Sequence, residues 1–385
     1  MTKSMLKDLA GLFFKLGTFA FGGPAAHISM MEEEVVRRKS WITHQQFLDL
    51  LGATHLIPGP NSTEMAIHIG YVKGGWKGLI VAGACFIFPA VVITLVCAQL
   101  YVTFGTIPQV GQFFWGIRSA VIAVIIAGVV RLGKPLIRNP FVAILSLGVV
   151  LLDLLGVDEV VLLLGAGAFG FAWANRNRLK HGVMSLFSFS VLPLGLITIR
   201  SVTSGNGADL VTLTGLGLFF LKIGSVLYGS GYVLIAFLQG GLVDARHWLT
   251  QTQLLDAVAV GQFTPGPVLS TATFIGYLIL GIPGAAVSTA GIFLPSFIFV
   301  LITSPFIPKL RKSPMAGGFL DGVNAASIGL MAAVCITLGL ATLTGIASWV
   351  IFVLAAVVLL RWRVNPAWII GGSAIAGGLF SIFKP

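Results

Sequence analysis

Charge is scarce in this sequence. Only 10% of its 385 residues are charged and 56% are hydrophobic, whereas a soluble domain carries roughly 25% charged residues. A chain with so few charged groups could not cover the surface of a soluble fold of this size. The composition therefore excludes an ordinary soluble domain and indicates a membrane protein.

Cysteines and catalytic motifs are scarce as well. The three cysteines lie in apolar runs and form no CxxC pair, so we expect neither a disulfide framework nor a metal site. No HExxH or GxSxG motif occurs, and the P-loop-like run 128–135 lacks the Ser or Thr that follows the lysine of a phosphate-binding loop. We therefore expect no cofactor and no ATPase domain, and a membrane-embedded enzyme is the least favoured function.

Long apolar runs contain almost no charge, and they cover residues 79–104, 119–130, 141–152, 183–199, 286–303 and 345–360. Most approach the roughly 20 residues needed to cross the hydrocarbon core of a bilayer. The N-terminal residues mix lysines with apolar side chains and lack a small-residue cleavage site, so no cleavable signal peptide is expected. These runs predict an all-α polytopic protein of the inner (plasma) membrane, with about 10–13 membrane segments.

The net charge is +11, and most basic residues sit in short loops between apolar runs. In that position they signal membrane topology through the positive-inside rule. A preference for anions is a second interpretation, compatible with the first. The expected partners are the lipid bilayer and a small solute, with no nucleic acid. The sequence leaves open whether the chain acts alone or as a homodimer.

The sequence repeats itself at a spacing of 207 residues. Between 15–60 and 222–267, 13 of 46 aligned residues are identical, and one deletion later the spacing becomes 206. Internal repeats are a signature of transporter folds. We therefore expect an N-terminal repeat over 1–175, a connecting segment over 176–210 with one extra transmembrane helix, and a C-terminal repeat over 211–385.

Equivalent loops of the two repeats carry opposite charge bias. Lys309, Arg311 and Lys312 lie in a connection whose first-repeat counterpart is uncharged. The acidic connection 153–159 has the counterpart 360–366, which carries Arg361 and Arg363. Because basic loops stay on the cytoplasmic side, we expect inverted-topology repeats, related by a pseudo-twofold axis in the membrane plane.

Each repeat contains two interruptions rich in glycine and proline. They are Phe21-Gly22-Gly23-Pro24, Pro58-Gly59-Pro60, Tyr228-Gly229-Ser230-Gly231 and Pro265-Gly266-Pro267. Proline removes a backbone donor and glycine allows positive φ, so these runs should break helices that either span or re-enter the membrane. Unwound backbone at membrane depth is tolerated only where it is buried or lines a cavity. Paired breaks in two repeats therefore point to a transport site.

Side chains near the breaks favour an anion. The N-terminus of a half-helix offers N–H donors and the positive end of a dipole, and an intramembrane lysine is costly and by default functional. The candidate solute-binding residues are Lys15, Gly22, Gly23, Asn61, Ser62, Lys222, Ser230, Gly231, Thr264 and Ser270. Many donors, two lysines and few acceptors describe an oxyanion site.

Four titratable side chains near the breaks are candidates for proton coupling: Glu64, His27, His55 and Glu32. Glu64 follows the Pro58-Gly59-Pro60 break by one turn, and the aligned region of the second repeat has no acid. A lone histidine in such a place is more often a hydrogen-bonded structural residue. The competing function is a cation-coupled importer or a channel for a small inorganic anion such as sulfate, in which Glu64 and backbone carbonyls bind a cation.

The sequence resembles the chromate ion transporter family, in its long-chain form with two fused chromate-transport domains. The runs that carry the resemblance are Lys15-Leu16-Gly17, Phe21-Gly22-Gly23-Pro24 with His27, Pro58-Gly59-Pro60-Asn61-Ser62, Gly70-Tyr71, Gly229-Ser230-Gly231-Tyr232, 261–267, 274–277 and Phe293-Leu294-Pro295-Ser296. The resemblance implies export of chromate, with sulfate as a similar oxyanion, driven by the membrane potential or a proton gradient. The residues by themselves predict only an anion, and most simply an oxyanion.

Overall fold

The computed structural model describes residues 3–20, 23–105, 108–136, 139–176, 211–228, 231–306, 314–362 and 364–383. Every regular element within these ranges is a helix. Four of the described helices are long and apolar enough to cross a membrane, and six shorter ones are also apolar. The chain is an all-α polytopic membrane protein, as its composition predicts. The extra helix expected over 183–199, the basic connection 309–312, Gly22 and Ser230 lie outside the described residues.

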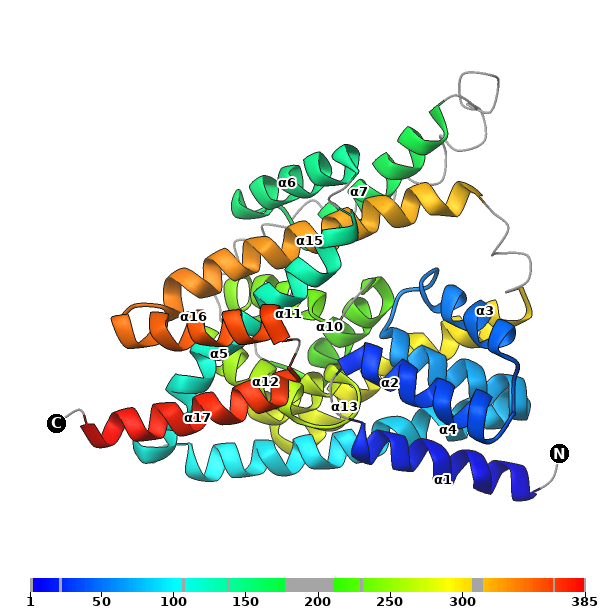
Figure 1. Ribbon diagram of the computed structural model, residues 1–385, viewed down its shortest axis with the longest axis horizontal. Coiled ribbons are helices and arrows are strands. Elements are labelled where there is room, and N and C mark those ends of the chain that lie inside the picture. The colour runs from blue at the N-terminus through cyan, green and yellow to red at the C-terminus, as the bar shows by residue number, and fades with distance from the viewer. Residues whose placement is uncertain are drawn as a thin grey trace.

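The two repeats have the same order of helices (Figure 1). The first contains α1 (Lys3–Phe19), α2 (Gly23–Glu32), the π-helix η1 (Glu33–Arg38), α3 (His44–Thr54), α4 (Asn61–Phe104), α5 (Pro108–Leu136), α6 (Pro140–Leu154) and α7 (Glu159–Ala174). The second contains α10 (Leu213–Val226), α11 (Val233–Leu238), the π-helix η2 (Gln239–Asp244), α12 (Gln251–Phe263), the 3₁₀ turn η3 (Val268–Ser270), α13 (Thr271–Thr303), the 3₁₀ turn η4 (Ser304–Phe306), α15 (Pro314–Thr342), α16 (Ile346–Trp362) and α17 (Pro366–Phe383).

Equivalent turns of the repeats have the same local geometry. The turn before α3 contains Ser40 with φ 47°, and the turn before α12 contains His247 with φ 54°. Both helices then begin with a capping box, in which Thr43 or Thr250 caps the backbone and the glutamine three residues later bonds back. The internal repeat of the sequence is therefore a repeat of backbone conformation.

Helices α4 and α13 are each a hairpin of two limbs. The bend falls at Gly75 in α4 (φ 51°) and at the equivalent Gly281 in α13 (φ 63°). The limbs touch backbone to backbone, because a Cβ on Gly70 would collide with the Gly78 carbonyl oxygen. The short limb of each hairpin begins at a Pro-Gly-Pro break, and the long limb crosses the molecule.

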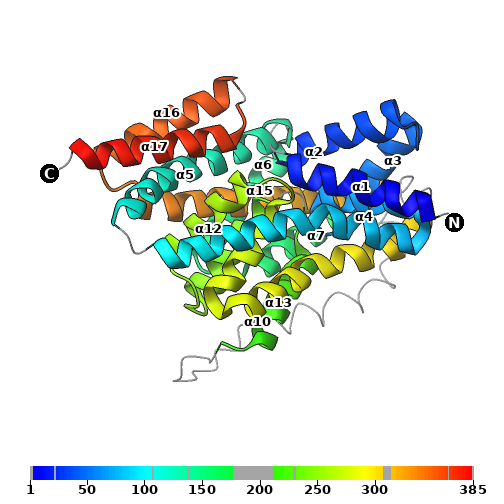
Figure 2. The same ribbon diagram turned by 90° about the horizontal axis from the view of Figure 1, so that it is seen from below.

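The long limbs of α4 and α13 pack against each other and run in opposite directions (Figures 1 and 2). Around these limbs, helices of each repeat pack on helices of the other repeat. Helix α5 packs on α16 and α17 of the second repeat, and α15 packs on α6 and α7 of the first. The repeats are thus inverted about a pseudo-twofold axis, as the loop charges predict.

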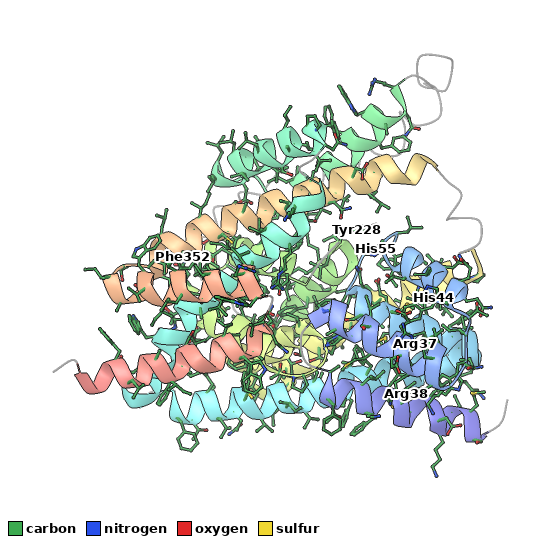
Figure 3. All side chains as sticks on the ribbon, in the orientation of Figure 1. Arg37, Arg38, His44, His55, Tyr228 and Phe352 are labelled. Carbon is green, nitrogen blue, oxygen red and sulfur yellow. The ribbon has the colours of Figure 1, made fainter. Side chains whose placement is uncertain are left out.

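One end of the molecule carries several basic side chains, of which Arg37 and Arg38 pair with Glu33 and Glu34. Figure 3 labels Arg37, Arg38 and His44 at the same edge, and Lys73 from the α4 bend donates a hydrogen bond to the Trp41 carbonyl oxygen at 3.3 Å. Since basic loops stay inside, this end is expected to face the cytoplasm.

The inverted arrangement predicts opposite sidedness for two equivalent turns. After the native cysteines Cys85, Cys97 and Cys335 are replaced, Ser40→Cys should react with an impermeant maleimide only in inverted vesicles. His247→Cys, at the equivalent exposed position, should react only in right-side-out vesicles, because inversion places the two turns on opposite faces. Labelling of both cysteines from the same face would show that the repeats are parallel.

Candidate solute-binding site

The four breaks meet through two backbone hydrogen bonds. The Gly59 N–H donates to the Leu227 carbonyl oxygen at 2.6 Å, and the equivalent Gly266 N–H donates to the Ala20 carbonyl oxygen at 3.1 Å. Each Pro-Gly-Pro loop therefore binds the residue that precedes the first break of the other repeat. The sequence places these breaks at equivalent points of two repeats, and the structure brings them together.

Half-helices begin at this crossing. Helix α4 starts directly after Pro60, and the Glu64 N–H donates to the Pro60 carbonyl oxygen at 3.0 Å in its first turn. Helix α2 starts at Gly23, whose φ of 78° makes the sharp change of direction after α1. The first N–H groups of a helix have no carbonyl within the helix to bond, and they carry the positive end of its dipole. The crossing thus presents donors suited to an anion.

Glu64 and Ser296 are buried polar side chains from opposite repeats, and both lie beside Gly59. Both are fully buried, and in the described part of the chain neither Glu64 oxygen nor the Ser296 hydroxyl has a hydrogen-bond partner. A Cβ on Gly59 would collide with Glu64 Oε1 and would lie 2.6 Å from Ser296 Oγ.

The equivalent place beside the second Pro-Gly-Pro loop has different chemistry. Ser270 is fully buried and accepts a hydrogen bond from Thr94 Oγ1 at 3.1 Å. Ala90 stands where the other side has Ser296, and its Cβ is the nearest atom to a Cβ built on Gly266. One side of the crossing therefore holds an acid, and the other holds only hydroxyl groups.

Other sequence-predicted binding residues lie around the crossing. Ser62 and Thr264 are buried, and Thr264 Oγ1 has no partner within the described ranges. The Asn61 amide lies 3.2 Å from His55 Nδ1. Gly231 borders η3, with a built Cβ 3.5 Å from the Leu269 and Val268 side chains.

The two lysines lie elsewhere. Lys15 Nζ is 3.3 Å from Glu34 Oε1, its side chain is 60% exposed, and it lines a hollow of about 580 Å³. Lys222 Nζ is 4.0 Å from Asp158 Oδ2 and lines a separate cavity of about 840 Å³ with Asp153 and other acids. Neither hollow is lined by a Pro-Gly-Pro residue, so the structure does not bring the lysines to the crossing.

The remaining proton-coupling candidates have partners. His27 Nε2 hydrogen-bonds with the Ala20 carbonyl oxygen at 3.0 Å, and Glu32 lies 3.2 Å from the His44 ring. His55 is exposed beside Asn61, and Figure 3 draws it next to Tyr228 in the middle of the view.

Sequence reasoning missed Ser296 as a site residue. It lies in the apolar segment of α13, directly after Pro295, and its counterpart in the first repeat is an alanine. Its signals in the sequence were its place in a run that carries the family resemblance and a hydroxyl beside a proline in a membrane segment. Its role depends on the packing of α13 against the Gly59 loop of the other repeat.

Two inverted helical repeats whose broken helices meet at a buried polar centre define a membrane transporter built from fused repeats. The chain belongs to the chromate transporter family. The family profile, described as chromate transporter, matches residues 7–171 and again residues 214–378.

Relatives match over nearly the whole chain. The chromate transport protein of Cupriavidus metallidurans is 34% identical over 376 residues, which cover 97% of this chain and 92% of that protein. The probable chromate transport protein of Synechococcus elongatus is 30% identical, with 97% and 95% covered. The chromate transport protein of Pseudomonas aeruginosa is 29% identical, with 97% and 92% covered. No solved structure matches the chain significantly.

The contact between Gly59 and Glu64 yields a mutational prediction. Gly59→Ala should abolish transport while the protein still inserts, because the new methyl would displace the Glu64 carboxyl and the Ser296 hydroxyl. Gly75→Ala is the matched control, since Gly75 also has positive φ but has open space around a built Cβ. Membrane abundance and initial chromate flux should be measured for both. Equal flux through the two variants would contradict a functional role for this contact.

Proposed function

We propose that the protein is a secondary transporter that exports chromate, and chemically similar oxyanions such as sulfate, from the cytoplasm across the plasma membrane. The observation that carries this proposal is the crossing of the four breaks, where helix N-termini and buried hydroxyls from both repeats converge. The names of the relatives support chromate as the solute. Sulfate is a tetrahedral dianion like chromate, so the same donors serve both.

The bound dianion sits at the crossing in this proposal. Leaving its charge uncompensated in an apolar core would cost many kcal/mol, whereas each charge-assisted hydrogen bond returns roughly 1.5–3 kcal/mol. The donors are the first N–H groups of α4 and the side chains of Asn61, Ser62, Thr264 and Ser270. The break residues Gly22, Gly23, Ser230 and Gly231 let the solute approach the backbone closely.

Glu64 is the group to which we assign proton coupling. An ionised carboxylate beside a dianion would repel it strongly in an apolar core, so Glu64 is protonated when the solute is bound. We assign the proton to Glu64 rather than to His27, His55 or Glu32, because those three have hydrogen-bond or ionic partners.

The membrane potential drives export under this assignment. A dianion that leaves together with one proton moves one net negative charge outward, and each charge gains about 2.3 kcal/mol per 100 mV. The interior-negative potential therefore favours export without ATP.

Flux measurements test the direction. Inverted vesicles expose the cytoplasmic face, so chromate uptake should rise with a lumen-positive potential and require no ATP. Uptake confined to right-side-out vesicles would support the cation-coupled importer, and equal flux in both orientations would support the channel.

Replacement of Glu64 tests the coupling. A glutamine side chain resembles the protonated acid, so Glu64→Gln should keep chromate flux within about tenfold of the native protein and lose its pH dependence. Glu32→Gln is the control, because its partner His44 lies at the exposed basic end, and it should retain the native pH profile. An unchanged pH profile in Glu64→Gln would exclude this residue as the proton carrier.

Lys15 is proposed to attract the anion at the hollow that it lines. The cavity of Lys222 is lined by Asp153, Asp158, Glu159 and Asp244, which would repel an anion, so no such role is proposed for Lys222. An exposed cation raises the local concentration of an anion, and salt screens this effect. Lys15→Met should therefore weaken the apparent affinity for cytoplasmic chromate by about tenfold at low ionic strength, with a smaller loss at high salt. The same affinity for Lys15→Met and the native protein at low ionic strength would remove Lys15 from the transport pathway.

A further inference from the structure

Two equivalent units of the protein are built alike but packed differently. We call α1–α3 the first arm and α10–α12 the second arm. Both contain a π-helix after the first break, a positive-φ residue in the following turn and a capping box. The two arms therefore have the same internal structure, and any difference in how they pack must come from the helices around them.

The second arm packs on the helices around it. Helix α11 contacts α15, and α12 contacts both α5 and α17. In the described segments, the equivalent pairs of the first arm, α2 with α5 and α3 with α15 or α7, make no contact of comparable extent. Figure 1 shows α1, α2 and α3 set apart from α16 and α17.

Side-chain exposure confirms the difference at equivalent positions. Leu255 of α12 is 2% exposed, whereas its counterpart Leu48 of α3 is 43% exposed. One turn further on, Ala259 is 1% exposed, whereas Gly52 is exposed and a Cβ built on it meets nothing within 4 Å. The same face is thus covered in the second arm and open in the first.

The docked arm is held by an ion pair. Arg118 of α5 donates from Nε and from a terminal nitrogen to the two Asp256 oxygens, each at 2.8 Å, and Asp256 is fully buried. The Tyr101 hydroxyl donates to the same carboxylate at 2.8 Å. A buried bidentate pair with a further donor joins α5 of one repeat firmly to α12 of the other.

The first arm has no cation beside it at the position equivalent to Arg118, and its Asp49 accepts a hydrogen bond from Gln45 Nε2 at 2.9 Å. Asp256 corresponds to Asp49, but Arg118 corresponds to Asn324 on α15. Two equivalent helix contacts confirm this alignment of the repeats. Gly116 of α5 packs closely on α17, and the equivalent Gly322 of α15 packs closely on α7. The chemistry that docks the second arm is therefore incomplete in the first.

We propose that the two arms dock alternately on the helices around them. The second arm is docked at rest because Arg118 pairs with Asp256, whereas the equivalent of Arg118 beside the first arm is the uncharged Asn324. The structure is then the state that is open at the basic, cytoplasmic end and closed at the other. In the opposite state Asp49 approaches Asn324, and Asp256 separates from Arg118. The proposal rests on the transport function above, and Arg118 and Asn324 act as positioning residues.

A charge swap tests this proposal. In a background without native cysteines, Gly52→Cys should react with an impermeant maleimide in inverted vesicles, and Ala259→Cys should resist it in right-side-out vesicles. Asn324→Arg supplies the missing cation and should slow Gly52→Cys labelling by about tenfold, because the new guanidinium can pair with Asp49 and dock the first arm. It should also make Ala259→Cys reactive.

Matched variants separate docking from misfolding. Adding Asp49→Asn to Asn324→Arg should restore the native labelling pattern, and Asn324→Gln should leave it unchanged. Arg118→Asn provides a second route, since loss of the ion pair should expose Ala259→Cys from the outer face. The proposal is overturned if Asn324→Arg leaves Gly52→Cys labelling unchanged, or if Arg118→Asn leaves Ala259→Cys protected. Cysteine labelling does not require a bound solute. It can therefore support the docking proposal even if the flux measurements contradict chromate export or proton coupling by Glu64.

Discussion

Two backbone hydrogen bonds between the repeats, Gly59 to Leu227 and Gly266 to Ala20, are the interactions on which the rest of the structure depends. A helix broken inside an apolar core exposes N–H and carbonyl groups, and each buried group left unpaired costs about 1–3 kcal/mol. Neither repeat forms these bonds alone, because each loop binds the carbonyl of the other repeat. The inverted pairing of repeats therefore stabilises a centre that contains unwound backbone.

The duplication preserves the backbone but not the chemistry. The residue equivalent to Glu64 is Ser270, and the residue equivalent to Ser296 is Ala90. The residue equivalent to Arg118 is Asn324. A symmetric protein would bind its solute and dock its arms equally on both sides. The differences at these positions make the two sides of the crossing, and the two arms, unequal in energy.

Much of this architecture follows from local sequence patterns. Apolar runs and Gly-Pro breaks are local features, and the structure contains helices and helix ends at those that fall within the described residues. Placement of side chains was less predictable. Lys15 follows the helical pattern of an apolar segment, but its exposure depends on how α2 and η1 fold back to place Glu34 beside it. The roles of Ser296 and Arg118 likewise depend on contacts between residues distant in the chain, which a periodic pattern does not encode.

The central claim is that the oxyanion binds where the four breaks cross. A structure determined experimentally with bound chromate tests it most directly, because the metal-centred anion scatters strongly. The account predicts chromate density between the loops of Gly59 and Gly266, within hydrogen-bond distance of the start of α4. Density confined to the hollow beside Lys15 or the cavity beside Lys222, with an empty crossing, would contradict it.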